Sequence, residues 1–234
     1  MEKFLYLFLD IFSFIIPFAY SFERKKLHFI RYWKPYFLSI FFVGIVFILW
    51  DIYFTKKGVW GFNDRYLIGI NFFELPLEEW LFFLLIPYSS NFIHYALLYF
   101  FPKPKLSKKV SQFVAITLFL VSTIIAIRFS DKTYTLWSFG SFSFLMFAQI
   151  IFKFKCFQRY FLSFTVIYIP FFVINSWLTG GFTPEPVVWY NNSENLGMRL
   201  GTIPLEDSFY CFTMLYSSLL LFEFLKSRFH ENQN

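Results

Sequence analysis

Two short motifs place paired carboxylic acids at the start of long apolar segments. They are Pro76-Leu-Glu-Glu79 and, 128 positions later, Pro204-Leu-Glu-Asp207. Proline suits the first helical position, because its missing N–H would be unpaired there anyway. Acids favour helix starts through the helix dipole, but ionisable groups that enter a membrane core are costly and usually functional. The catalytic candidates are therefore Glu78, Glu79, Glu206 and Asp207.

Such acids are suited to proton transfer. Burial and like-charged neighbours favour the protonated form of a carboxyl group, while the helix dipole favours the charged form. Carboxyl groups that share an apolar site cannot all ionise, so we expect at least one of the four to hold a proton near neutral pH. That group would act as a general acid and its partner as a general base. Rings near the motifs would stabilise a cation by about 0.5–2 kcal/mol per face. These rings are Phe72, Phe73, Trp80, Phe82, Phe83, Phe209, Tyr210 and Phe212.

The composition restricts where these motifs can reside. Hydrophobic residues make up 57% of the 234 residues and charged residues only 15%, whereas soluble domains have about 25% charged residues. This excludes a soluble enzyme, a disordered tail and a nucleic-acid-binding module, despite a net charge of +6. The chain is expected to be an all-α integral membrane protein.

Seven stretches are long and apolar enough to span a bilayer, which takes roughly 20 residues. Pro17, Pro87 and Pro170 fall inside spans and are expected to bend them. The first stretch lacks the features of a cleaved signal peptide, so it is expected to be retained. The predicted spans are 4–21, 35–54, 77–101, 110–128, 134–152, 160–179 and 205–225.

The basic residues predict the orientation of these spans. Lys and Arg concentrate in alternate connections and after the last span, and they are sparse on the other side. By the positive-inside rule, the N-terminus lies outside and the C-terminus in the cytoplasm of a cytoplasmic membrane. The predicted cytoplasmic residues are Arg24, Lys25, Lys26, Arg31, Lys34, Lys103, Lys105, Lys108, Lys109, Lys153, Lys155, Arg159, Lys226 and Arg228.

The spacing of 128 extends beyond the acids. It also relates Gly69 to Gly197 and Asn63 to Asn191. This predicts a parallel 3+1+3 repeat, with a first three-helix unit at 1–103, a linking span at 104–130 and a second unit at 131–234. An odd linking helix would bring both acidic motifs to the same side of the membrane.

The two motif regions, residues 63–83 and 175–210, resemble the two halves of the carotenoid (lycopene) cyclases of the heterodimeric or fused membrane type. The resemblance implies protonation of a linear ψ end group of lycopene, ring closure through a carbocation and loss of a proton to give a β-ionone ring. No electron is transferred, so no cofactor is expected, and no nucleotide-binding glycine motif is present. The substrate, lycopene or a related linear carotenoid, would arrive laterally from lipid.

The resemblance also assigns roles to residues. Glu78 and Glu206 would form the main acid/base pair, assisted by Glu79 and Asp207. Independently of the resemblance, the shift of 128 places Arg199 where the first copy has Asn71. We hypothesise that Arg199 pairs with Glu206 or Asp207 and keeps it ionised, which leaves the other motif as the proton donor. The expected substrate-binding residues are Trp60, Trp80, Phe82, Phe83, Trp177, Arg199 and Tyr210, and the expected supporting residues are Asp51, Asn71 and Asn175.

Other interpretations remain at this point. A carotenoid ε-cyclase or hydratase of the same family would use a similar acid, and a small parallel-repeat transporter would use polar residues such as His94. A retinal protein is excluded, because the last span contains no lysine. Cys156, Cys211 and the scattered histidines have neither disulfide nor zinc spacing. The sequence does not predict the oligomeric state or whether one or two rings are formed.

Overall fold

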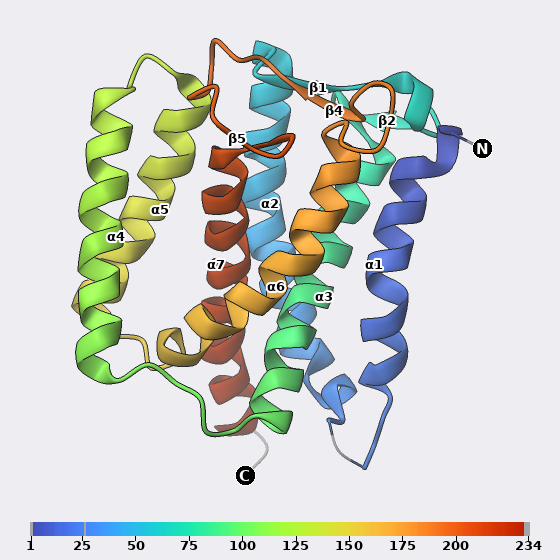
Figure 1. The fold of residues 1–234 in the computed structure, drawn as a ribbon. Coiled ribbons are helices and arrows are strands. Elements are labelled where there is room, and N and C mark those ends of the chain that lie inside the picture. The colour runs from blue at the N-terminus through green and yellow to red at the C-terminus, as the bar shows by residue number, and fades with distance from the viewer. Residues whose placement is uncertain (1, 26, 232–234) are drawn as a thin grey trace. The chain divides into compact units, whose positions relative to one another are not determined.

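The computed structural model describes residues 2–25 and 27–231. Its seven α-helices, shown in Figure 1, are all long and apolar enough to cross a membrane. The seven predicted spans and the all-α membrane fold are thereby confirmed. The helices are α1 (Leu5–Ser21), α2 (Trp33–Lys57), α3 (Leu77–Phe100), α4 (Lys108–Arg128), α5 (Thr133–Phe152), α6 (Phe157–Leu178) and α7 (Leu205–Glu231).

Side chains are distributed as a lipid environment requires. Large apolar residues point outward on several helices, for example Phe113 on α4 and Phe144 on α5, which are 71% and 74% exposed. Polar residues are instead buried, including Asp10, Asp51 and Asn91. Because lipid offers no hydrogen bonds, polar groups in a spanning helix must face other protein groups.

The three prolines that the sequence places in spans do lie inside helices α1, α3 and α6. Side-chain hydroxyls donate to the carbonyl oxygens of two of them. Ser21 donates to Pro17 at 2.7 Å and Tyr36 donates to Pro87 at 2.5 Å. These bonds are to the prolines' own carbonyl oxygens, whereas the carbonyl that a proline leaves unpaired lies four residues earlier in the helix.

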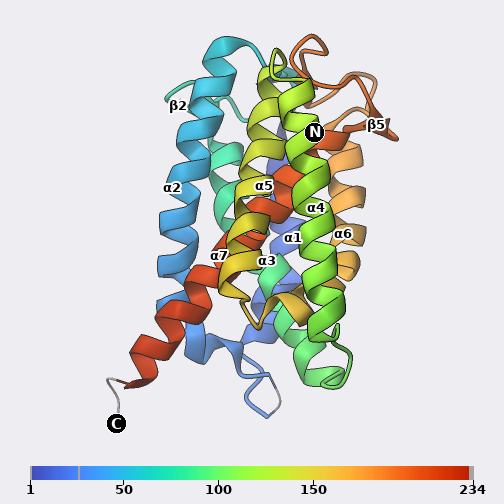
Figure 2. The same cartoon turned by 90° about the vertical axis from the view of Figure 1, so that its left-hand side faces the viewer.

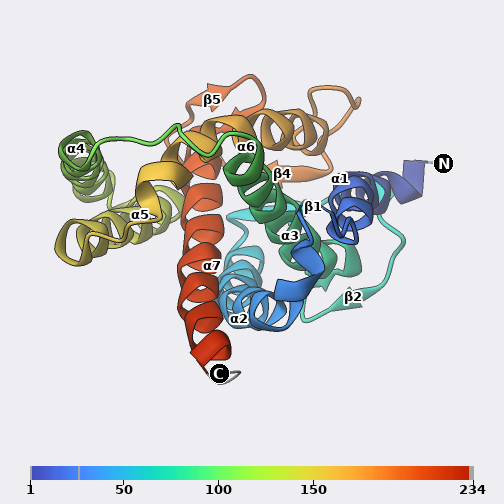
Figure 3. The same cartoon turned by 90° about the horizontal axis from the view of Figure 1, so that it is seen from below.

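The first of two compact units contains residues 1–57, 62–102 and 214–234. Within it, α1 and α2 both pack on α3, as the view in Figure 3 shows. Tyr36 and Phe29 pack edge-on with centroids 5.2 Å apart, and Phe222 of α7 lies 5.1 Å from Tyr36. The N-terminal end of α1 and the C-terminal end of α7 lie at opposite ends of this unit (Figure 1).

The second compact unit contains residues 58–61 and 103–213. Helices α4 and α5 lie side by side (Figure 2), and the hydroxyls of Thr123 and Ser143 join them at 2.6 Å. Strand β1 (Trp60–Phe62) begins in this unit, where it pairs with β4 (Val188–Tyr190). The first turns of α7, through Thr213, also belong to this unit.

A short β-hairpin, with two residues in each strand, precedes each of the helices that begin with an acidic pair. Strands β2 (Asn71–Phe72) and β3 (Leu75–Pro76) form the first hairpin, and β5 (Arg199–Leu200) and β6 (Ile203–Pro204) form the second. Helices α3 and α7 therefore begin at Leu77 and Leu205, one residue after the prolines. The prediction that proline occupies the first helical position is wrong, because Pro76 and Pro204 lie in extended hairpin strands.

Candidate functional site

The first acidic pair lies in the first turn of α3, which the β2–β3 hairpin leads into. Glu78 is fully buried and Glu79 is 8% exposed. Oε1 of Glu78 accepts a hydrogen bond from the backbone N–H of Ile68 at 2.7 Å. Oε2 of Glu79 accepts one from the hydroxyl of Tyr6 at 2.5 Å. The pair is thus tied to the loop before α3 and to α1.

Two further acids join this pair from neighbouring helices. Asp51 of α2 is 1% exposed and interacts electrostatically with Glu79. Asp10 of α1 is fully buried and interacts electrostatically with both Glu78 and Glu79. The first unit therefore gathers four buried carboxyl groups from three helices, a group that we call the first cluster: Asp10, Asp51, Glu78 and Glu79.

The second acidic pair, at the start of α7, has a different set of neighbours. Glu206 is fully buried, and its Oε1 accepts hydrogen bonds from the N–H of Leu196 at 2.8 Å and the hydroxyl of Thr135 at 2.7 Å. Asp207 accepts hydrogen bonds from the hydroxyls of Tyr134 at 2.5 Å and Tyr190 at 2.9 Å. In this second cluster, which consists of Glu206, Asp207 and these donors, neutral donors surround the two carboxyl groups.

Several of these contacts recur after 128 positions. The N–H that binds Glu78 belongs to Ile68, and the one that binds Glu206 belongs to Leu196. In each pair, Oε2 of the glutamate is buried without a hydrogen-bond partner among the described residues. The tyrosine contacts recur as well, since Tyr6 and Tyr134 are also 128 positions apart. The backbone that presents the acids is therefore the same in both places.

The two clusters differ at the position of Asp10. The shift of 128 takes Asp10 to Ser138, whose hydroxyl donates to the backbone carbonyl of Glu206 at 2.8 Å. It also takes Leu7 to Thr135, which adds a hydrogen-bond donor to the second cluster. The first cluster thus has an additional acid where the second has hydroxyl groups.

Aromatic rings surround the second cluster. Tyr134 and Tyr190, which both bind Asp207, stack with centroids 5.9 Å apart. Trp60 lies edge-on to Tyr134 at 5.0 Å and to Tyr210 at 6.2 Å. Near the first cluster, Phe82 lies edge-on to Tyr6 at 6.5 Å and to the buried Phe83 at 5.8 Å. Among the predicted residues, Trp60 and Tyr210 therefore contact Tyr134 of the second cluster. Phe82 contacts Tyr6, which binds Glu79, and Phe83 contacts Phe82.

Other predicted wall residues lie apart from the acids. The indole of Trp80 donates to the carbonyl of Phe72 in the exposed hairpin at 3.3 Å. Trp177 packs on Phe182, with ring centroids 5.0 Å apart. The expected supporting residues also lie in different parts of the structure. Asp51 belongs to the first cluster, but Asn71 is exposed in β2.

Asn175 is buried near the end of α6, and Arg199 is exposed in β5. The backbone carbonyl of Asn175 accepts from the N–H and hydroxyl of Thr179, both at 2.8 Å. The guanidinium of Arg199 donates to the carbonyl of Thr202 at 2.6 Å and to Asn192 at 2.9 Å. Arg199 therefore makes no direct ion pair with Glu206 or Asp207, because its exposed guanidinium donates to Thr202 and Asn192, but it does interact electrostatically with the buried Asp207.

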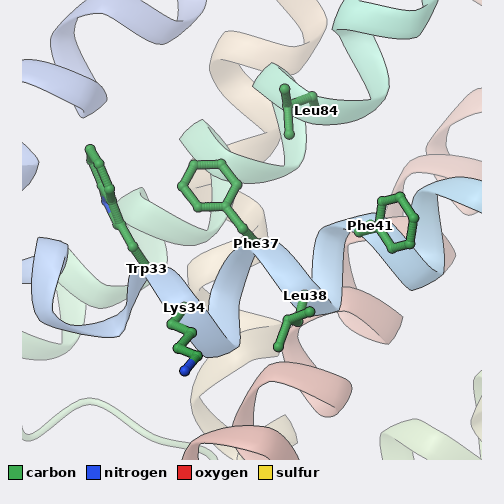
Figure 4. Close-up of a pocket in the computed structure, with 6 residues that line it drawn as sticks. All are labelled: Trp33, Lys34, Phe37, Leu38, Phe41 and Leu84. Carbon is green, nitrogen blue, oxygen red and sulfur yellow. The ribbon is translucent and has the colours of Figure 1, made fainter.

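Each unit also has a surface depression. One, of about 310 Å³, is lined by Tyr190, Arg199 and Thr202 among others. Tyr190 connects it to Asp207, to which its hydroxyl donates. The other is an apolar groove of about 550 Å³ on α2 and α3. In Figure 4, Phe37 extends from α2 toward the helix that carries Leu84, whereas Lys34 extends to the other side of α2. The groove residues are Trp33, Lys34, Phe37, Leu38, Phe41 and Leu84.

Sequence reasoning missed several residues of the two clusters: Tyr6, Asp10, Tyr134, Thr135 and Tyr190. The spacing of 128 would have paired Tyr6 with Tyr134, since the repeat extends into the first helix of each half. Asp10 is the single acid inside the apolar stretch 5–21, which is itself a functional signal in a membrane helix.

The arrangement can carry out proton transfer. Buried carboxyl groups that crowd together hold protons that they can release, and hydrogen-bonded carboxylates can receive them. Among the described residues, no group of three or more His, Cys, Asp or Glu side chains is arranged to hold a metal ion.

Sequence comparisons with known proteins identify the family of this chain. The sequence model of the family described as lycopene cyclase matches residues 3–97 and 131–225, two segments whose ends are 128 positions apart. The bifunctional lycopene cyclase/phytoene synthase of Leptosphaeria maculans is 34% identical over 50 residues, which are 21% of this chain and 9% of that protein. The matched region thus covers less than a tenth of that relative's length. No solved structure matches the chain. Since the matched segments include both acidic motifs and most of the chain, the protein belongs to the lycopene cyclase family.

Proposed function

We propose that this protein cyclises the ψ end groups of lycopene, or of a related linear carotenoid, to β-ionone rings without any redox change. A proton adds to the terminal C=C bond of the substrate, and the resulting tertiary cation is attacked by an internal C=C bond to close a six-membered ring. Loss of a proton from the ring then gives the product. Because one proton is added and one is lost, the reaction is an isomerisation.

The main support for this proposal is the first cluster, in which four buried carboxyl groups lie together. An alkene is a weak base, so its protonation needs an acid that is kept away from water. Four carboxyl groups buried among apolar helices cannot all carry a negative charge, since burial and mutual repulsion both oppose ionisation. Glu78 and Glu79 are therefore the proposed proton donors, with Asp10 and Asp51 beside them.

The second cluster suits the opposite task. Asp207 accepts two tyrosine hydroxyl bonds, and Glu206 accepts a backbone N–H and a threonine hydroxyl. Hydrogen bonds to the charged form of a carboxyl group favour that form. We assign Glu206 and Asp207 to stabilising the cation and accepting its proton, with the rings of Trp60 and Tyr190 adding cation–π stabilisation.

The apolar surface supports substrate access from lipid. A linear polyene has no polar group to guide it, so it must reach an acid through hydrophobic contacts. The groove on α2 and α3 offers aromatic side chains, including Phe37 and Trp33, along the membrane-spanning part of the first unit (Figure 4). We propose that it holds the part of the chain that is not reacting. We also propose a location in the cytoplasmic membrane, with the N-terminus outside and the C-terminus in the cytoplasm.

Expression in a bacterium that accumulates lycopene tests the function directly. Chromatography of the pigments should show γ-carotene or β-carotene in place of lycopene. An ε-ring product would show that a different proton is lost in the last step. A hydroxylated product would show that water captures the cation. Unchanged lycopene, with the protein present in the membrane fraction, would refute the proposal.

A further inference from the structure

The depression of about 310 Å³ in the second unit lies in the connection between α6 and α7. Its lining residues fall between Leu178, where α6 ends, and Leu205, where α7 begins, so they lie outside the membrane-spanning helices. The hydroxyls of Thr179 and Thr202 are 2.6 Å apart on this lining, and Arg199 adds a positive charge. Since one water molecule takes up about 30 Å³ in the liquid, the depression has room for several.

Tyr190 connects this depression to a buried acid. It lines the depression, and its hydroxyl donates to Oδ2 of Asp207 at 2.9 Å. Asp207 itself is only 5% exposed. A hydroxyl group is both a donor and an acceptor, so it can take up a proton from a carboxyl group while it releases its own. The side chain of Tyr190 therefore has the position and the chemistry to pass a proton between Asp207 and water.

The other groups around Asp207 do not offer such a connection. Tyr134, the second hydroxyl that binds Asp207, is 2% exposed and does not line the depression. Glu206 is fully buried. Arg199 lines the depression and interacts with Asp207 through its charge, but a guanidinium does not lose its proton in proteins. Of the two hydroxyls that bind Asp207, that of Tyr190 thus belongs to the residue that reaches the depression.

The first unit has no hydroxyl at the corresponding position. The shift of 128 takes Tyr134 to Tyr6, which binds Glu79 in the same way. It takes Tyr190 to Phe62, which cannot accept or donate a proton. The buried tyrosine bond is therefore common to both acidic motifs, whereas the bond from a residue on a surface depression is a feature of the second.

The strand that carries Tyr190 is held closely in place. Strand β4 pairs with β1, and Trp189 lies directly against Gly61. A Cβ atom at Gly61 would lie 2.4 Å from Cζ2 of Trp189, a distance that only glycine avoids. The ring of Trp60 packs edge-on to Tyr190 at 6.1 Å. These contacts fix the direction of the Tyr190 side chain between the depression and Asp207.

From this geometry we infer that Tyr190 acts through Asp207 as a proton relay, which carries the proton released by the ring to water in the depression. This inference rests on the proposed cyclisation, with Asp207 as the proton acceptor. A C–H bond of the ring cation breaks, and its proton forms an O–H bond with Asp207. The oxygen of Tyr190 then accepts this proton while its own hydroxyl proton passes to a water molecule. Asp207 is again a carboxylate, and no electron is transferred.

The test measures ring formation by the wild type and Tyr190→Phe in two assays. With enzyme in excess over lycopene, the rate of the first ring does not require Asp207 to lose its proton. With lycopene in excess, each enzyme molecule must lose that proton before it acts again. Tyr190→Phe keeps the ring and removes only the hydroxyl. We expect its first-ring rate to stay within about 3-fold of the wild type, and its multiple-turnover rate to fall at least about 10-fold.

Two further tyrosine variants are the controls. Tyr168→Phe removes a hydroxyl that pairs with Ser208 at 2.7 Å, and it should leave both rates unchanged. Tyr134→Phe removes the buried bond to Asp207 and should slow both assays by the same factor. Thermal unfolding of each purified variant in detergent identifies those that fold. If Tyr190→Phe does not fold, Thr202→Phe fills the depression instead and should produce the same difference between the two rates.

A relay and a merely structural role predict different results. If the multiple-turnover rate of folded Tyr190→Phe, or of Thr202→Phe in its place, falls no further than the first-ring rate, the inference is overturned. That result, with an active wild type, would leave the proposed cyclisation intact. Absence of ring formation by the wild type in both assays would instead refute the proposed function, and the relay with it.

Discussion

The hydroxyl of Tyr6 donates a 2.5 Å hydrogen bond to Oε2 of Glu79, which lies 73 positions later in the chain. The same separation and length describe the bond from Tyr134 to Asp207. In each case the first helix of a matched region holds an acid in the first turn of its third helix. The contact holds the second acid of each motif, while Oε2 of the first acid, Glu78 or Glu206, is buried with no hydrogen-bond partner in the part of the chain that the structure describes.

Replacing the first acid of either motif should stop the reaction. We expect Glu78→Gln and Glu206→Gln each to reduce cyclisation in lycopene-accumulating cells by at least about 100-fold, because each removes a carboxyl group that is proposed to donate or accept a proton. Pigment chromatography measures the product, and Glu74→Gln, at an exposed hairpin position, is the control. Normal β-carotene formation by either variant would show that its motif is not needed.

Removing the hydroxyl of Tyr6 or Tyr134 should affect cyclisation less than removing an acid does, and it should also lower the folding stability. Tyr6→Phe and Tyr134→Phe each leave a buried carboxyl group without one of its donors, which should cost about 1–3 kcal/mol of folding stability. Denaturant unfolding in detergent measures this loss. Tyr99→Phe, at an exposed tyrosine near the end of α3, should be neutral. Equal stability of all three variants would contradict the roles assigned to Tyr6 and Tyr134.

The rings around Asp207 should affect the rate more than those on the hairpins. Trp60→Leu removes a ring that contacts Tyr134, Tyr190 and Tyr210, and it should slow cyclisation by up to about 30-fold if the ring stabilises a cation by about 2 kcal/mol. Trp80→Leu removes a ring that contacts the exposed β2–β3 hairpin. A larger rate loss in Trp80→Leu than in Trp60→Leu would contradict this ranking.

Arg199 provides a test of how Asp207 is stabilised. Because Arg199 donates hydrogen bonds to Thr202 and Asn192 and acts on Asp207 only through a charge interaction without a direct bond, Arg199→Gln should change the rate by no more than about 2-fold, as is usual for surface substitutions. Tyr190→Phe, which removes a hydroxyl bond to Asp207, should reduce it more. The reverse order in initial rates would mean that charge on Arg199 matters more than the hydroxyl bond.

The first hairpin stores backbone strain that glycine should relieve. Phe73 and Glu74 both have positive φ, at 50° and 71°, whereas the second hairpin has Gly201 at the corresponding first position. A left-handed conformation costs a non-glycine residue roughly 1–2 kcal/mol. Glu74→Gly should therefore raise the unfolding temperature in detergent, while Asp64→Gly, at an N-terminal helical position, should not. A lower unfolding temperature for Glu74→Gly would argue against strain at this turn.

The sequence alone was sufficient to predict the seven spans, both acidic pairs and the spacing between them. Spans are visible because their length and apolar composition are set by the bilayer, whatever their neighbours are. The acids were visible because an ionisable residue stands out in an apolar segment. The position of the prolines was predicted incorrectly, since the hairpin that holds Pro76 depends on a backbone turn at Phe73 and Glu74, two residues that do not favour it.

The partners of the acids depended on the tertiary structure. Asp10 meets Glu78, and Tyr6 meets Glu79, only because one face of α1 packs against the start of α3. Local sequence does not specify which face of an apolar helix turns toward which neighbour, because every face of such a helix can meet either lipid or protein. The sequence therefore determined which residues could transfer a proton, and packing decided which of those residues lie near one another.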